Sequence, residues 1–173
     1  MHMLHLLRHA KSSWKKEVED HERPLNRRGR EAARRVGEAL PAAVGNLDLI
    51  LCSSARRTRE TMELVIADLS VRPRIVLEDE LYEASKDELK DRLRRLAEEI
   101  GNVLLIGHNP GLRDLAIAIA DTSTASFRTL SSDKFPTAAR ASFRVREPWS
   151  GFGRLRCELL GYVTAESLRS DRD

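Results

Sequence analysis

Short apolar runs recur along the chain, and a segment with helical spacing follows each of them. The runs cover residues 3–7, 47–52, 74–77 and 102–107, of which the third is the weakest. Continuous apolar runs of this length are typical of strands that are covered on both faces. Because strands and helices alternate, the pattern predicts an α/β domain with a largely parallel sheet.

Four segments carry apolar residues at the spacing of a helix face, namely residues 29–44, 55–69, 85–100 and 112–120. Asn26 lies where a side-chain cap of the first helix is expected. The third segment begins with Ser85-Lys86-Asp87-Glu88, a capping-box signature, and Gly101 is expected to end that helix. These signals predict one helix after each strand.

The last third of the chain has a different pattern. Residues 123–136 are polar and aperiodic, which predicts a loop. Residues 137–146 and 153–163 predict two strands that form a hairpin or an addition to the sheet edge. A polar tail from about residue 167 is expected to fray. The whole pattern predicts a mostly parallel central sheet flanked by helices, with an antiparallel edge strand.

The length and charge of the chain narrow the classes of protein to which it can belong. At 173 residues it is expected to form a single domain over residues 1–173. Hydrophobic residues make up 41% and charged residues 33%, a balance typical of a globular protein. The 30 basic and 27 acidic side chains leave a formal charge of only +3, and no basic strand is rich in aromatic residues. We therefore expect no nucleic-acid partner.

The two cysteines, Cys52 and Cys157, lack the spacing of a metal site, and we expect them to fill the core as free thiols. No Cys/His cluster suits zinc, so neither a metal nor another cofactor is expected. The N-terminus lacks the features of a signal peptide, and no apolar run approaches the roughly 20 residues that cross a bilayer. The sequence therefore predicts a cytoplasmic protein with no membrane partner, and it leaves the oligomeric state open.

Polar side chains suited to an anion follow three of the predicted strands. Arg8 and His9 follow the first strand, Arg57 lies in the segment after the second, and His108 follows the fourth. In a parallel sheet, ligands bind beyond the carboxyl ends of the strands. Each of these motifs alone has an ordinary explanation as a turn or an exposed helix face. Their convergence favours a shared phosphate site.

Two histidines and two arginines beside one crevice are suited to phosphoryl transfer. A neutral imidazole can attack phosphorus and form a phosphohistidine, which divides one difficult step into two easier ones. Arginine stays charged and donates hydrogen bonds in a fork that fits phosphate oxygens. A second histidine can donate to the transferred group or position water.

Three motifs resemble those of the histidine phosphatase superfamily. Leu7-Arg8-His9-Ala10 resembles its Arg-His-Gly signature, with Ala10 in the glycine position. The segment from Ser53 to Thr61 resembles the second motif, Ser-x-x-x-Arg-x-x-x-Thr, and this spacing selects Arg57. Gly107-His108-Asn109-Pro110 resembles the third motif. Segments 20–26 and 81–85 are similar to the SixA-like phosphohistidine phosphatase branch, and the matches extend from residue 4 to about residue 120.

The resemblance implies a three-layer, phosphoglycerate mutase-like fold and a role for each site residue. His9 would be the nucleophile, Arg8 and Arg57 would hold the phosphate, and His108 would donate a hydrogen bond to the phosphoryl group. Glu83 is the nearest match to the acid that protonates the leaving group in the family. The SixA-like branch does not always retain that acid.

The expected activity is metal-independent hydrolysis of phosphohistidine through a covalent intermediate on His9. From Arg57 to Glu83 is 26 residues and from Glu83 to His108 is 25, which leaves no room for a large lid. An open crevice suits a phosphohistidine presented by another protein, such as a phosphotransfer domain. Two alternatives stay open. One is a phosphomonoesterase of small phosphorylated substrates, which needs Glu83 or another acid at the pocket, and the other is a non-catalytic phosphate-binding module.

Overall fold

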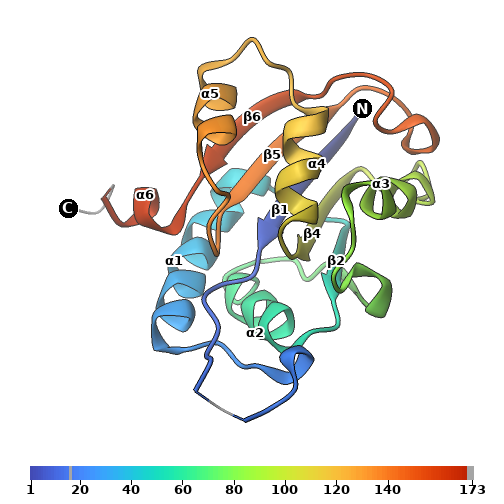
Figure 1. Ribbon diagram of the computed structural model, residues 1–173. Helices are drawn as coiled ribbons and strands as arrows, with labels where there is room; N and C mark the ends of the chain where they lie inside the picture. Colours follow the sequence, from blue (N-terminus) through green and yellow to red (C-terminus); the bar gives the residue numbers. More distant parts are fainter. Residues whose placement is uncertain (16, 171–173) are drawn as a thin grey trace.

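Six strands form one sheet in the computed structural model, which describes residues 1–15 and 17–170 (Figure 1). The strands are β1 (His2–Arg8), β2 (Leu49–Ser53), β3 (Arg74–Glu78), β4 (Asn102–Gly107), β5 (Arg140–Val145) and β6 (Glu158–Val163). Their order is β3-β2-β4-β1-β5-β6. Pairs among β1 to β4 are parallel, whereas β5 pairs antiparallel with both β1 and β6. The predicted fold class, including the antiparallel addition at one edge, is confirmed.

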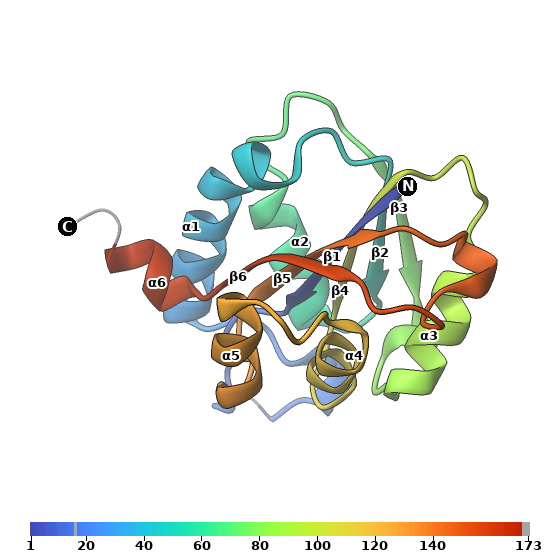
Figure 2. The ribbon, with the colours of Figure 1, turned by 90° about the horizontal axis from the view of Figure 1, so that it is seen from above.

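Helices cover both faces of the sheet and so make three layers. They are α1 (Arg27–Val44), α2 (Arg56–Val65), α3 (Lys86–Arg94), α4 (Gly111–Ile119), α5 (Ala125–Ser132) and α6 (Ala165–Ser170). Figure 2 shows α1, α2 and α6 on one side of the sheet and α3, α4 and α5 on the other. Three short 3-10 helices cover Asp20–Glu22, Asp79–Leu81 and Trp149–Gly151.

The core consists of two apolar layers separated by the sheet. Successive side chains of a strand point to opposite faces, so Leu105 packs toward α3 and α4, whereas Ile106 packs toward α1 and α2. Both side chains are fully buried. Burial on both faces is the reason why these strands read as continuous apolar runs. Cys52 and Cys157 are buried free thiols, as predicted.

The predicted caps are present at two helix starts. The Asn26 side chain accepts a hydrogen bond from the Gly29 backbone N–H at 2.8 Å and begins α1. At the start of α3, Ser85 and Glu88 form the reciprocal bonds of a capping box. These side chains satisfy backbone donors that the first helical turn leaves without partners.

Four boundaries differ from the prediction. The loop expected over residues 123–136 contains α5, in which the Thr124 side chain caps the Phe127 N–H at 3.1 Å. The helix expected to reach Gly101 ends at Arg94, and the one expected to reach residue 69 ends at Val65. The tail expected from about residue 167 begins inside α6, and its last residues, 171–173, lie outside the described residues.

Candidate active site

Two histidines lie side by side at the carboxyl end of the sheet. Strands β1 and β4 pair in parallel with Arg8 opposite Gly107, so His9 and His108 directly follow two adjacent strands. Their ring centroids are 5.3 Å apart, and the side chains are 6% and 7% exposed. The sheet register therefore brings together two residues that are about a hundred positions apart in the sequence.

A cavity of about 390 Å³ opens beside this pair. Its lining comprises Arg8, His9, Lys11, Ser12, Trp14, Arg23, Arg57, His108, Asn109 and Thr137. Four of the five residues expected to form the site are in this group. The fifth, Glu83, is not among the lining residues; it is exposed and has a left-handed backbone conformation with φ of 56°.

The hydrogen bond of His9 determines which ring nitrogen is free. Its Nδ1 lies 2.7 Å from the Ala10 carbonyl oxygen, which can only accept, so Nδ1 carries the proton and Nε2 carries the lone pair. Burial lowers the pKa of His9 to about 3, and the neighbouring Arg8 and Arg57 charges also lower it. The ring is therefore neutral at physiological pH and offers a nucleophilic nitrogen.

His108 has one nitrogen bonded to the protein and one without a partner among the described residues. Its Nε2 lies 2.7 Å from the Ser53 hydroxyl oxygen, whereas its buried Nδ1 has no hydrogen bond. Burial, followed by the Arg57 charge, lowers the pKa of His108 to about 3. When the Ser53 hydroxyl donates to Nε2, the proton of the neutral ring is on Nδ1, which can then donate to a bound anion.

Arg57 lies in the first turn of α2, where Asp20 holds its guanidinium. The group is buried and donates to the Asp20 carbonyl oxygen at 2.8 Å and to the Asp20 carboxylate at 3.1 Å. The same carboxylate accepts hydrogen bonds from the Tyr82 hydroxyl and from Arg23. The Tyr82 bond and then the two arginines lower the pKa of Asp20 to about 2, so this carboxylate is ionised and anchors Arg57.

Arg8 is held by the segment that follows α5. Its guanidinium donates to the Phe135 carbonyl oxygen at 3.2 Å, and the Ala138 N–H donates to the carbonyl oxygens of Arg8 and His9. Phe135 and Ala138 both have left-handed backbone conformations, with φ of 54° and 65°. Burial and the nearby Arg57 charge lower the pKa of Arg8, which means that the two guanidinium groups repel each other. An anion between them would relieve this repulsion.

Three buried nitrogen atoms of the cavity-lining residues have no hydrogen-bond partner among the described residues. They are Nε of Arg8, Nε of Arg57 and Nδ1 of His108. Buried polar groups are normally paired, so an unpaired group needs an explanation. A tetrahedral oxyanion, with several acceptor oxygens and a negative charge, is a ligand that can satisfy such donors.

Other contacts explain why the second motif contains Ser and Thr. The Thr61 hydroxyl accepts from the Ala10 N–H at 2.9 Å and donates to the Arg57 carbonyl oxygen at 2.7 Å. It therefore ties the residue after the nucleophile candidate to the helix that carries Arg57. Ser53 performs the corresponding task for His108.

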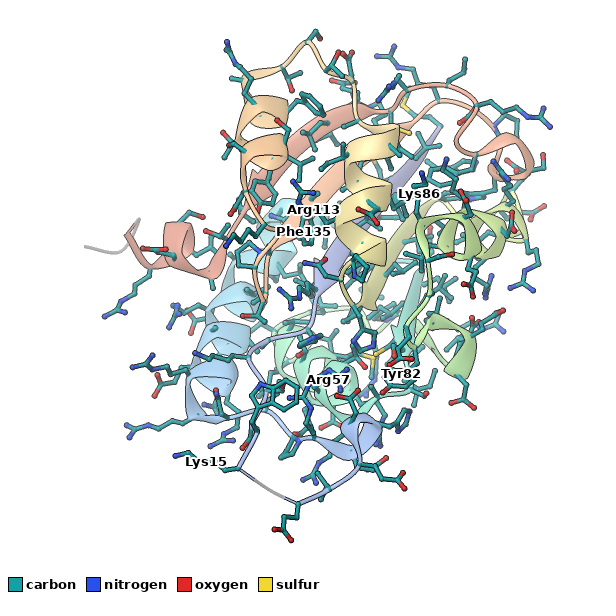
Figure 3. The ribbon with its side chains drawn as sticks, in the orientation of Figure 1. Lys15, Arg57, Tyr82, Lys86, Arg113 and Phe135 are labelled. Carbon is teal, nitrogen blue, oxygen red and sulfur yellow. The ribbon has the colours of Figure 1, made fainter. Side chains whose placement is uncertain are left out.

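Sequence reasoning assigned no role to Asp20, Tyr82 or Ser53. The signal for each was present, because the first two lie in segments 20–26 and 81–85 and the third begins the second motif. Figure 3 shows Tyr82 and Arg57 at the same end of the molecule, although they come from different elements. The Asp20 carboxylate accepts hydrogen bonds from both side chains, although the three residues lie far apart in the sequence. No local pattern predicts such a pairing.

The described residues contain no group of three or more His, Cys, Asp or Glu side chains that could hold a metal ion. None of the helices over residues 1–15 and 17–170 combines the length and apolar character needed to cross a membrane.

Comparison with known sequences identifies a family. Residues 4–104 match the model of the histidine phosphatase superfamily (branch 1). The Mycobacterium tuberculosis protein Rv1276c is 34% identical over 146 residues, which cover 83% of this chain and 90% of that protein.

Solved structures agree with this result. A protein from Nakamurella multipartitia, provisionally named phosphohistidine phosphatase SixA, superposes with a TM-score of 0.80 and 26% identity over 94% of this chain and 95% of its own. The protein histidine phosphatase SixA complexed with tungstate gives 0.76 and 21%, over 96% and 99% of the two chains. A phosphoserine phosphatase from Entamoeba histolytica gives 0.64 and 14%, over 97% and 100%. The last two likenesses, at low identity, show the fold alone.

Proposed function

This chain belongs to the histidine phosphatase superfamily, and on that premise we propose that it hydrolyses phosphohistidine through a covalent intermediate on His9. The observation that carries the proposal is the neutral His9 ring, with Nε2 as its free nitrogen, beside three buried donors that lack partners among the described residues. A nucleophile and a set of oxyanion donors at one cavity are the parts that phosphoryl transfer requires.

The first step is attack by His9 Nε2 on the phosphorus atom. A new N–P bond forms while the bond from phosphorus to the substrate ring breaks. The electron pair of the broken bond stays on that ring nitrogen, and because the other ring nitrogen carries a proton, the group that leaves is neutral imidazole. Arg8, Arg57 and His108 donate to the phosphoryl oxygens and stabilise the charge that they carry in the transition state. The Asp20 carboxylate keeps Arg57 in position for this task.

The second step is attack by water on the phosphorylated His9. The N–P bond breaks, its electron pair returns to Nε2, and inorganic phosphate leaves with the oxygen and a proton of the water. The remaining proton is released to solvent, which restores the free enzyme. Each step balances without a further reactant.

The acids near the cavity support one choice of leaving group. Expelling an alkoxide requires a proton donor, whereas imidazole is a much better leaving group. No carboxylic acid is among the described residues that line the cavity, and Asp20 is ionised because its pKa is about 2. Because the described cavity lining lacks a protonated carboxyl group, phosphohistidine is the substrate class that we favour over phosphate esters.

A phosphomonoesterase of small substrates is the second candidate, and one observation favours it. The Tyr82 ring contacts the His108 ring at a centroid distance of 5.5 Å, and burial and Asp20 raise the pKa of its hydroxyl. This hydroxyl is therefore protonated and is a possible acid for an alkoxide. Under this alternative, Tyr82→Phe would slow hydrolysis of esters much more than hydrolysis of phosphohistidine.

A paired turnover assay tests the proposal. The purified protein is given a histidine-containing phosphotransfer domain phosphorylated with phosphoramidate and, separately, phenyl phosphate, with the His9→Ala variant as control. We expect kcat/KM to be higher for the phosphohistidine substrate. The opposite preference would support the phosphomonoesterase. Binding of orthovanadate without turnover of either substrate would overturn both proposals in favour of a binding module.

A further inference from the structure

A second cavity of about 460 Å³ adjoins the candidate active site. Its lining comprises Lys11, Ser12, Ser13, Trp14, Lys15, Asn26, Arg27 and Arg28. Lys11, Ser12 and Trp14 also line the first cavity, so the two cavities adjoin along this segment. We call the outer part, formed by Lys11, Trp14, Lys15, Arg27 and Arg28, the Trp14 surface. Figure 3 shows Lys15 on the loop that follows β1, at the same end of the molecule as Arg57.

The charged side chains that line the two cavities all have the same sign. Every charged side chain among the described residues that line either cavity is a lysine or an arginine. Lys15 and Arg28 are exposed, and the first turn of α1, which begins at Arg27, contains no acidic residue. The partial positive charge of a helix N-terminus therefore adds to the side chains. A surface of this kind attracts an acidic partner and repels a basic one.

Trp14 is exposed but held in place. Its side chain is 78% exposed, and the guanidinium of Arg23 lies 3.5 Å from its ring centroid. Arg23 is itself 7% exposed and donates to the Ser12 hydroxyl at 2.7 Å and to Asp20 at 3.0 Å. An aromatic ring that is positioned before binding loses little conformational freedom on binding, and Trp and Arg are enriched among the residues that dominate interfaces.

The backbone under Trp14 is seated on the start of α1. The Asn26 N–H donates to the Lys11 carbonyl oxygen at 3.0 Å, and the Ser13 N–H donates to the Pro24 carbonyl oxygen at 2.8 Å. A Cβ added at Gly29 would lie only 2.0 Å from the Lys11 carbonyl oxygen, so only glycine allows this approach. The close packing fixes the Lys11–Trp14 segment relative to the first turn of α1.

We propose that the Trp14 surface docks the acidic face of the protein that carries the phosphohistidine. This inference rests on the function proposed above and names the partner's surface chemistry. A phosphoryl group alone needs only the donors on Arg8, Arg57 and His108. Three further cations, Lys15, Arg27 and Arg28, line the outer cavity around Trp14 and not the first one, so they are placed to contact a larger substrate that extends out of the first cavity. Of these three, Arg27 also pairs with Glu31 at 3.2 Å.

Two synthetic peptides and one small molecule test the docking. The peptides carry the same phosphohistidine, flanked in one by Asp and Glu and in the other by Lys; the small molecule is phosphoramidate. We expect wild-type kcat/KM to be about tenfold higher for the acidic peptide at low ionic strength, and salt to reduce the difference. In the double variant Lys15→Glu/Arg28→Glu, the preference should disappear while hydrolysis of phosphoramidate is unchanged.

The matched control is Arg34→Glu/Arg74→Glu, which makes the same change in charge at exposed positions that line neither cavity. This control should keep the preference for the acidic peptide. Equal rates for the two peptides with wild-type protein, or an unchanged preference in the Lys15/Arg28 variant, would overturn the docking surface but not the proposed function. Failure of the wild-type protein to hydrolyse both phosphoramidate and the peptides would instead overturn the proposed function.

Discussion

The candidate site has a floor and a rim that are built in different ways. The floor, formed by Arg8, His9, Arg57 and His108, lies at strand ends and in the first turn of a helix, and three of its four side chains are buried. The rim, formed by Trp14, Asp20, Arg23 and Tyr82, lies on segments between the longer helices and the strands. Sheet register positions the floor, whereas contacts between side chains position the rim.

This difference separates two tasks. A reacting nitrogen must lie within a fraction of an ångström of its productive position, and rigid elements provide that accuracy. Loops tolerate changes of sequence more easily and commonly carry the residues that select a ligand. We infer that the floor performs the chemistry and that the rim orients Arg57 and selects the substrate.

Removal of the nucleophile should have the largest effect. The His9→Ala variant should lose turnover of every phosphorylated substrate, by about 10⁴-fold or more, because no covalent intermediate can form. Stopped-flow or long-incubation assays of phosphate release measure the loss, and retained orthovanadate binding shows that the floor is still folded. Residual activity within about tenfold of wild type would exclude His9 as the nucleophile.

Two neighbouring arginines provide the next test. Arg57→Ala should lower kcat/KM by about 10²–10³-fold, because it removes a buried donor to the transferred group. Arg56→Ala should change it by less than about twofold, since Arg56 is half-exposed and its ion pair with Glu60, at 3.6 Å, lies on the surface. Steady-state kinetics of both variants give the comparison. A larger effect of Arg56 would mean that the assignment is wrong by one residue.

Asp20→Asn tests whether this rim residue affects catalysis by holding Arg57 of the floor in position. Asn retains the shape but loses the charge that anchors Arg57, so we expect kcat/KM to fall by about tenfold for phosphohistidine and phosphate esters alike. The readout is the ratio of the two losses together with the pH profile. A loss confined to esters, with a change in the pH profile, would instead identify Asp20 as a proton donor. Glu22→Gln, on the same 3-10 helix, is the matched control.

As the pH falls, the protein should first lose stability through the two histidines of the floor and only at lower pH through Asp20 of the rim. Burial lowers the pKa of His9 and His108 to about 3, whereas in the unfolded chain these rings titrate near 6.5. The unfolded state therefore binds protons first, and the free energy of unfolding falls as the pH drops from about 6.5 toward 3. Asp20, with its pKa lowered from 3.8 to about 2, contributes stability that is lost only below about pH 4.

Urea unfolding at about pH 7 and about pH 5 measures this effect, which should be about 1–2 kcal/mol for each buried ring. The variant His9→Asn should lose less stability on acidification than the wild type, because one of the proton-binding differences has been removed. Equal losses in the two proteins would contradict the low pKa of His9.

The floor was predictable from the sequence because burial on both faces leaves a strong local signal. Strands β1, β2 and β4 read as continuous apolar runs, and their polar ends identify His9, Arg57 and His108. Helix α5 was not predictable, since only Phe127 and Leu130 of its eight residues pack against the core. Two apolar positions in a polar segment do not define a helical face.

The helix expected over residues 85–100 ended early for a tertiary reason. Leu96 and Ile100 continue the helical spacing and pack against the core, but they do so from an irregular segment after the end of α3. The Ile100 carbonyl oxygen accepts from the Trp149 indole at 2.7 Å, and the Glu98 carboxylate accepts from the Trp149 N–H at 2.6 Å. Partners about fifty residues away hold this segment, and periodicity carries no information about them. For the same reason, the sequence pattern did not predict the contact between Asp20 and Arg57.

Substitution of Glu83 should have the smallest effect on kcat/KM. Glu83 contrasts with Tyr82, the residue before it, whose ring contacts that of His108. Family resemblance makes Glu83 the acid, whereas the structure leaves it exposed and outside the lining of the cavity. We expect Glu83→Gln to change kcat/KM for phosphohistidine by less than about twofold, because imidazole leaves without a strong acid and the side chain does not line the cavity. Assays on both substrate classes, with Asp79→Asn as control, measure this. A loss of about tenfold on esters alone would make Glu83 the proton donor and would shift the assignment toward a phosphomonoesterase.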